Sequence, residues 1–107
     1  MFQFEEDYIL SNVLVELSPL KIEHEESLLN VSNNKEIWTH FTENGLGPQN
    51  FKKYIKTAID KRNKGQHYPM VIKDMRKNQI AGITRIYEVD NKLKNAKIGH
   101  TWLGKNL

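Results

Sequence analysis

The sequence predicts an α+β fold, with helices packed on a mostly antiparallel sheet, and three observations support this. The segment after Pro48 carries one apolar stripe with clear 3.6-residue periodicity. Three segments typical of β-strands follow one another from residue 67 to residue 103, separated only by short polar turns. Helical segments followed by a run of neighbouring strands are typical of the α+β class.

The chain is expected to start with a strand and a helix. Residues 13–17 are partly β-branched and are followed by Ser18 and Pro19, so they are expected to form a strand that ends there. Residues 20–31 are expected to form a helix, because acidic side chains fill its first turns and complement the helix dipole.

A short second helix is predicted after residue 33. Asn33 is followed three residues later by Glu36, which resembles a capping box with Asn in place of Ser or Thr. This helix would carry Trp38 and lead to Phe41. Residues 42–48 contain two glycines and a proline and are expected to form a loop.

The clearest predicted helix follows Pro48. Its stripe, polar only at the last position, consists of Phe51, Tyr54, Ile55, Ala58, Ile59 and Arg62. The lysines on its other sides are expected to face solvent, and Gly65 stands where a glycine would end the helix.

Three strands are predicted in the second half, at residues 67–73, 79–87 and 95–103. Gly82 in the middle of the second is expected to mark a bulge or a close approach of another chain segment. The predicted order is therefore β-α-α-α-β-β-β, ending in an antiparallel meander.

The composition fits one domain or part of one. The chain has 107 residues and no cysteine, which excludes disulfides, thiol nucleophiles and cysteine-ligated zinc. No apolar run approaches the roughly 20 residues of a membrane-spanning helix. The acidic start of the chain lacks the basic residues of a secretory signal. We therefore expect a cytoplasmic protein with no membrane partner.

Charge is divided unevenly along the chain. Residues 1–44 contain nine acidic residues and two lysines, whereas residues 45–107 contain four acidic residues and fourteen Lys or Arg. Two interpretations are open: two solvated faces, or a basic surface for an anionic partner such as a nucleotide-bearing cofactor. Aromatic residues do not alternate with Lys or Arg on a strand face as in stacking platforms, which argues against nucleic acid.

Several motifs that would identify a site are missing from the sequence. It has neither type of glycine-rich nucleotide loop, no G-x-S-x-G elbow and no H-E-x-x-H. The histidines are scattered, at His24, His40, His67 and His100. Their spacing predicts no metal site.

The most informative stretch is the last predicted strand. Regular alternation would place Ile98, His100 and Trp102 on one side and Gly99, Thr101 and Leu103 on the other. The strand ends in Trp-Leu-Gly, and the basic, polar residues after it are typical of the entry to a turn.

Four strings then connect the chain to a known family: residues 15–20 (VELSPL), 36–38 (EIW), 80–85 (IAGITR) and 98–104 (IGHTWLG). Together with the order of elements they resemble the Gcn5-related N-acetyltransferase (GNAT) superfamily, in the branch that acetylates ribosomal-protein N-termini and small amines. The last string is the most specific, because members of that branch end the fourth strand in this way. The resemblance covers the whole chain but only the first half of the family domain, so residues 1–107 are expected to form a single incomplete domain.

The resemblance implies transfer of an acetyl group from acetyl-CoA to a primary amine of a protein N-terminus or a small molecule, without a metal. In the family, backbone amides at the end of the fourth strand bind the pantetheine arm and polarise the thioester carbonyl. This places Trp102, Leu103 and Gly104 at the cofactor. The family's loop for the pyrophosphate, which opens a helix, would come after Leu107.

The resemblance also suggests the remaining site residues. His100 is the expected general base, since imidazole has a suitable pKa near 6.5, and Glu88 is an alternative base. The acceptor would lie near Arg85 and Tyr87 on the middle strand, and near Trp38, His40 and Phe41 in and after the second helix.

Structural roles remain open for the same residues. His100 could be a sheet histidine bonded for packing, and Trp102 could fill the core. Arg85 and Tyr87 could form an exposed pair on the outer sheet face, and Glu88 could be only solvated.

An alternative function follows from the incomplete domain. Without the phosphate loop, the chain is expected to bind acetyl-CoA weakly or not at all. Its last strand would present an open edge, which favours pairing with a second copy. The alternative is therefore a non-catalytic interaction module that forms a homo-oligomer through this edge.

Overall fold

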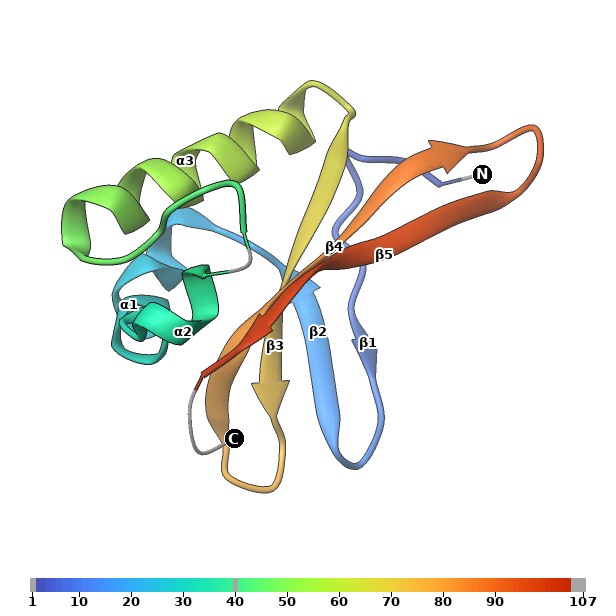
Figure 1. Cartoon of the computed structure of the whole chain (residues 1–107). Coiled ribbons are helices and arrows are strands. Elements are labelled where there is room, and N and C mark those ends of the chain that lie inside the picture. Colours follow the sequence, from blue (N-terminus) through green and yellow to red (C-terminus); the bar gives the residue numbers. More distant parts are fainter. Residues whose placement is uncertain (1, 40, 105–107) are drawn as a thin grey trace.

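The structure of the protein, a computed structural model, describes residues 2–39 and 41–104. An antiparallel sheet has the order β1-β2-β3-β4-β5, with β1 (Leu10–Ser11), β2 (Val15–Pro19), β3 (His67–Asp74), β4 (Gln79–Asp90) and β5 (Asn95–Leu103). The helices are the 3-10 helix η1 (Ile22–His24), α1 (Glu25–Ser32), α2 (Lys35–Trp38) and α3 (Pro48–Asn63). The three α-helices lie together on one side of the sheet, and the β4–β5 hairpin projects beyond them (Figure 1). The predicted α+β class and the closing meander are confirmed.

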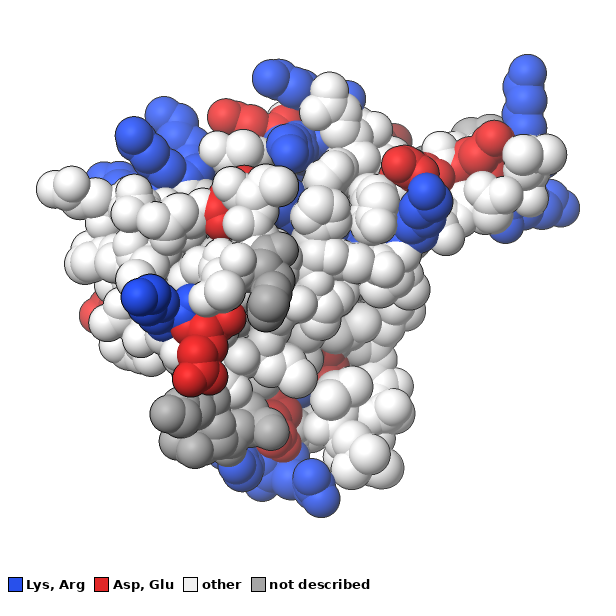
Figure 2. Space-filling view, viewed as in Figure 1, with Lys and Arg blue, Asp and Glu red and all other residues white. Residues whose placement is uncertain are grey.

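The helix α3 has the predicted amphipathic pattern. Phe51, Tyr54, Ile55 and Ala58 are buried, and lysines cover its outer surface (Figure 2). Gly65 follows the helix with a φ of 70°, a conformation that glycine adopts without strain, and its N–H donates to the Arg62 carbonyl.

The core joins this stripe to α1, α2 and the helix-facing side of the sheet. Its buried members are Leu20, Leu28, Trp38, Phe51, Tyr54, Ile55, Ala58, Val71, Ile83 and Trp102. Each large apolar side chain removed from water in this way stabilises the fold by about 1.5–3 kcal/mol.

The first half of the chain differs from the prediction at element boundaries. The first predicted strand lies at Val15–Pro19, includes the proline, and pairs with a short strand β1 that was not predicted. Pro19 is tolerated because β1 pairs only with Leu17 and Glu16, which leaves Pro19 at an edge. The predicted helix 20–31 divides into η1 and α1. Asn34, not Asn33, caps α2, since its extended backbone lets the side chain accept from the Glu36 N–H.

Gly82 confirms both expectations for its position. The β3–β4 register shifts beside it, where Ile72 pairs with Gly82 and Lys73 with Ile80. A Cβ at Gly82 would collide with the backbone carbonyl of Trp102 on β5. The absent side chain therefore allows β5 to approach β4 closely.

The alternation predicted for β5 is wrong at Ile98, because the strand is not regular. The register shifts between the pairs Ile83–Trp102 and Arg85–Gly99, and His100 has a φ of 51° within the bulge. Trp102 is buried in the core, whereas Ile98 is exposed. The bulge thus changes the side of the sheet on which the residues before it lie.

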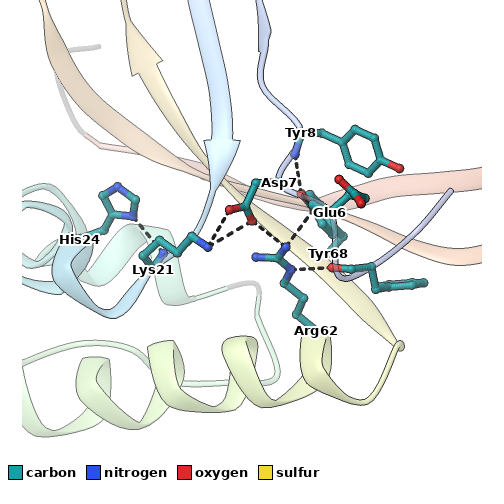
Figure 3. Close-up of polar contacts among 8 residues, drawn as sticks. Glu6, Asp7, Tyr8, Lys21, His24, Arg62 and Tyr68 are labelled. Atoms are coloured by element: carbon teal, nitrogen blue, oxygen red, sulfur yellow. Dashed lines mark hydrogen bonds and ion pairs between the residues drawn. The ribbon is translucent and has the colours of Figure 1, made fainter.

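The N-terminal residues are held to α3 and β3 through Arg62 (Figure 3). Its Nε donates to the Phe4 carbonyl at 2.8 Å, and its Nη2 donates to the Glu6 carbonyl and the Asp7 carboxylate. The guanidinium lies over the Tyr68 ring, 4.7 Å from its centroid. We call this set, Phe4, Glu6, Asp7, Arg62 and Tyr68, the N-terminal anchor.

Candidate functional site

A group of polar side chains gathers where β3, β4 and β5 run side by side on the helix-facing side of the sheet. The antiparallel register pairs His67 with Tyr87 and Arg85 with Gly99, one residue before His100. Glu43, from the loop between α2 and α3, reaches the same place. We call this set, Glu43, His67, Arg85, Tyr87 and His100, the polar cluster.

Arg85 is the centre of the polar cluster and is 0% exposed. Its Nη1 donates to His67 Nδ1 at 3.1 Å, and its guanidinium lies 5.2 Å from the Tyr54 ring centroid. Nη2 lies 3.9 Å from Glu43 Oε1, too long for a hydrogen bond. Among the described residues, Arg85 Nε and Nη2 have no hydrogen-bond partner. Of the two interpretations left open for Arg85, the exposed position on the outer sheet face is therefore excluded.

The contact with Arg85 fixes the state of His67. A guanidinium only donates, so Nδ1 of His67 must carry the lone pair and Nε2 the hydrogen. Burial, and then the Arg85 charge, lower the pKa of His67 to about 4. His67 is therefore neutral at physiological pH.

His100 is placed by the bulge in β5. Its ring lies 5.0 Å from that of Tyr87 and 5.3 Å from that of His67, measured between centroids. Partial burial, and then the Arg85 charge, lower the pKa of His100 below its ordinary value of 6.5. A neutral imidazole on an exposed residue can accept a proton from a bound amine.

The end of β5 presents main-chain groups to its outer edge. The Gly104 N–H donates to the Ala81 carbonyl at 2.7 Å, so it is not free for a cofactor. Because hydrogen-bonding direction alternates along an antiparallel strand, the N–H and C=O of Leu103 point away from β4. Trp102 main-chain groups face β4, and its side chain fills the core and donates to the Tyr54 hydroxyl at 3.2 Å.

A surface pocket of about 490 Å³ lies between this strand end and α2. Phe41, Trp102 and Leu103 are among the residues that line it. Of the predicted cofactor residues, Leu103 therefore has both free main-chain groups and a neighbouring cavity, a combination that fits an amide-bearing chain such as pantetheine.

The predicted acceptor residues of the second helix belong largely to the core. Trp38 is buried, donates to the Ser32 carbonyl at 3.0 Å, and lies 5.6 Å from Trp102 between ring centroids. A Cβ at Gly45 would lie 2.5 Å from the Trp38 indole, so the loop after α2 packs directly on this ring. His40 lies outside the described residues.

Glu88 belongs to β4 rather than to the predicted turn, and has a φ of 49°. Its carboxylate is exposed and accepts from Lys97 Nζ at 2.7 Å. This hydrogen bond raises the pKa of Lys97. Glu88 thus forms an exposed ion pair with a lysine of the projecting hairpin.

Sequence reasoning missed His67, Glu43 and Tyr54 as neighbours of Arg85. His67 was only one scattered histidine, and its position beside Tyr87 depends on the register of β3 and β4. Tyr54 was expected only as part of an apolar stripe. No local pattern marks Glu43.

Within residues 2–39 and 41–104, no group of three or more His, Asp or Glu side chains could hold a metal ion. No helix in the described part of the chain is long and apolar enough to cross a membrane.

Comparison with known proteins identifies the fold. No protein-family model matches the sequence, and no curated protein matches it. A GCN5-related N-acetyltransferase from Brucella melitensis matches with a TM-score of 0.78 and 19% identity, over 96% of this chain and 48% of that protein. RimL, a ribosomal L7/L12 alpha-N-protein acetyltransferase, matches with a TM-score of 0.70 and 18% identity, over 98% of this chain and 57% of RimL.

The microcin C7 self-immunity acetyltransferase MccE matches with a TM-score of 0.65 and 24% identity, over 89% of this chain and 53% of MccE. The chain thus spans about half the length of the solved structures it resembles. It has the fold of about half of a GNAT acetyltransferase.

Proposed function

We propose that the chain is the N-terminal half of a GNAT-type N-acetyltransferase and forms the acceptor side of its active site. The observation that carries the proposal is the position of His100, which the bulge in β5 places within the polar cluster, 5.0 Å from the Tyr87 ring between centroids. RimL has been solved with coenzyme A and MccE with acetyl-CoA, which supports acetyl-CoA as the donor.

In this proposal each part of the site has one task. Acetyl-CoA supplies the acyl group as a thioester. The outward main-chain groups of Leu103 and the pocket beside it hold the pantetheine arm. The acceptor amine lies at the polar cluster and forms a bond to the acetyl carbon, while the C–S bond of the thioester breaks and coenzyme A leaves as a thiolate that takes up a proton from solvent. An imidazole nitrogen of His100 takes the proton that the amine loses.

The test is acetyl transfer by the full-length gene product against a panel of primary amines. His100→Ala is expected to lower kcat by about 10²–10⁴-fold, the usual contribution of a general base. Glu88→Ala is the matched control, because that carboxylate contacts Lys97 and is expected to leave kcat unchanged. Equal losses of kcat in His100→Ala and Glu88→Ala would contradict the role of His100 as the general base.

The non-catalytic module remains a second candidate because of one observation. In the described part of the chain, β5 is the last strand of the sheet and no strand pairs with its outer edge. An open edge of this kind favours pairing with a second copy. Light scattering of the 107-residue chain tests it: a concentration-independent monomer would exclude association through this edge.

A further inference from the structure

Arg85 is a buried cation whose binding capacity is only partly used. Its Nη1 is occupied by His67, while Nε and Nη2 have no hydrogen-bond partner among the described residues. A buried donor without a partner costs about 1–3 kcal/mol, and more when it is charged. Such a cost at the centre of a site indicates that a partner arrives from outside.

The two unpaired nitrogens define the shape of that partner. Nε and Nη2 lie on the same edge of the planar guanidinium and direct two parallel N–H groups outward. This fork matches the two oxygens of a single carboxylate, which binds an arginine edge through two charge-assisted hydrogen bonds.

The loop before α3 already places a carboxylate close to this edge. Glu43 Oε1 lies 3.9 Å from Nη2, near enough for an ion pair and too far for a hydrogen bond. The Glu43 side chain is 32% exposed, so it lies between the guanidinium and solvent. Glu43 therefore lies next to the Nε–Nη2 edge of Arg85 but forms no hydrogen bond with it.

A surface pocket lies beside Glu43. It has a volume of about 400 Å³ and is lined by Glu43, Lys53, Lys61 and Tyr54, whose ring contacts the Arg85 guanidinium. Arg85 itself does not line the pocket, so a ligand there reaches the guanidinium only when Glu43 moves aside. The two lysines add positive charge at this pocket, which favours an anionic ligand.

We propose that Arg85 binds a carboxylate of the acceptor, so that the acceptor class is amines that also carry a carboxylate group. This inference rests on the proposed acetyltransferase function. The incoming carboxylate replaces Glu43 at the Nε–Nη2 edge. The amine of the same molecule then lies on the side of His100, whose ring neighbours Tyr87 and His67.

The first experiment needs no activity. Sodium acetate is titrated into the 107-residue chain, with sodium chloride as the ionic-strength control, while the ring signals of His67 and His100 are followed by NMR. Saturable shifts are expected with acetate only. Glu43→Gln is expected to tighten acetate binding by about three- to tenfold, because the competing carboxylate is gone. Arg85→Met is expected to abolish saturation.

The second experiment uses the full-length gene product with linear ω-amino acids of two to six carbons and their amides as acceptors. For the chain length that fits, the ratio of kcat/KM for the acid over the amide is expected to exceed about tenfold. Arg85→Met is expected to bring this ratio to about one, and Arg85→Lys, which keeps the charge but loses the fork, to an intermediate value. Lys56→Met, on the exposed face of α3, is the matched control.

The outcomes separate the two proposals. Acetylation with an acid-to-amide ratio that Arg85→Met leaves unchanged would overturn the role of Arg85 and leave the function standing. Saturable acetate binding that depends on Arg85, without acetylation of any amine, would overturn the function and leave the carboxylate site standing. The absence of saturable acetate binding in both the unmodified chain and Glu43→Gln would overturn the carboxylate site.

Discussion

Two arginines, Arg62 in the N-terminal anchor and Arg85 in the polar cluster, both contact a tyrosine ring but differ in their hydrogen bonds. Each guanidinium lies over a tyrosine ring, Tyr68 for the first and Tyr54 for the second. Arg62 is 12% exposed and uses Nε and Nη2 on two carbonyls and a carboxylate. Arg85 is fully buried, and the same two nitrogens are unpaired among the described residues.

The difference separates an arginine that holds the fold together from one that is prepared for a ligand. The bonds of Arg62 join residues far apart in the chain, so their loss weakens the attachment of the N-terminal segment, which the Tyr68 hydroxyl also holds. The unpaired donors of Arg85 lower the stability of the fold, and a local cost of this kind is typical of binding sites.

Arg62→Met is expected to lower the free energy of unfolding by about 2–3 kcal/mol, because it removes charge-assisted hydrogen bonds to the Phe4 and Glu6 carbonyls. Urea denaturation followed by circular dichroism measures this. Lys56→Met on the exposed face of the same helix is the control and is expected to change stability by less than about 0.5 kcal/mol. If Arg62→Met lowers the free energy of unfolding no more than Lys56→Met does, the N-terminal anchor does not stabilise the fold.

Acidification is expected to destabilise the protein through His67. The folded-state pKa is about 4 and the unfolded value about 6.5, so between these values the unfolded chain binds the extra proton. Stability is therefore lost as pH falls from 6.5 to 4, by roughly 1–2 kcal/mol after allowance for partial exposure. Unfolding at pH 7 and pH 4.5, compared with His67→Gln, isolates this contribution. An identical pH dependence in the two proteins would contradict it.

Arg85→Met is expected to change the free energy of unfolding by no more than about 1 kcal/mol, in either direction. The variant removes a buried charge that is only partly compensated, and a methionine fills similar volume. In the same variant the pKa of His67 is expected to rise but to stay below 6.5, since burial is the largest cause of its shift. Denaturation and NMR titration of the ring signal measure the two quantities. A stability loss as large as that of Arg62→Met would make Arg85 a structural residue.

The smallest effect is expected at Asp7. Hydrogen bonds from Arg62 and then Lys21 lower the pKa of its carboxyl below the ordinary value. The carboxylate is 57% exposed, so salt screens its charge. Carbon-13 NMR titration is expected to give a low pKa that rises towards the ordinary value in 1 M sodium chloride. A pKa that salt does not move would point to the short hydrogen bonds alone.

The sequence predicted the parts of the fold that depend on local periodicity. The stripe of α3 needs only 3.6-residue spacing, and Gly65 needs only the positive φ that ends the helix. Gly82 was recognised as exceptional because a strand interior rarely accepts glycine without reason. In each case neighbouring residues in the chain contained the information.

The remaining features depend on contacts between distant segments. The strand β1 contains only two residues, and it forms because Leu10 pairs with Leu17 of β2. His67 joins Arg85 because of the β3–β4 register, and the bulge at His100 arises from the pairing of β5 with β4. The burial of Arg85 could not be read from its sequence neighbours, because the residues that cover it come from α3 and the loop before it.

The packing of Gly45 on Trp38 brings the loop before α3 into contact with the aromatic core beside the last strand. A Cβ at position 45 would lie 2.5 Å from the Trp38 indole, and that indole in turn packs on Trp102, next to Leu103. Glu43 lies two residues before Gly45 in the same loop. Replacement of Gly45 by alanine would therefore force either the Trp38 indole or the loop that carries Glu43 to shift.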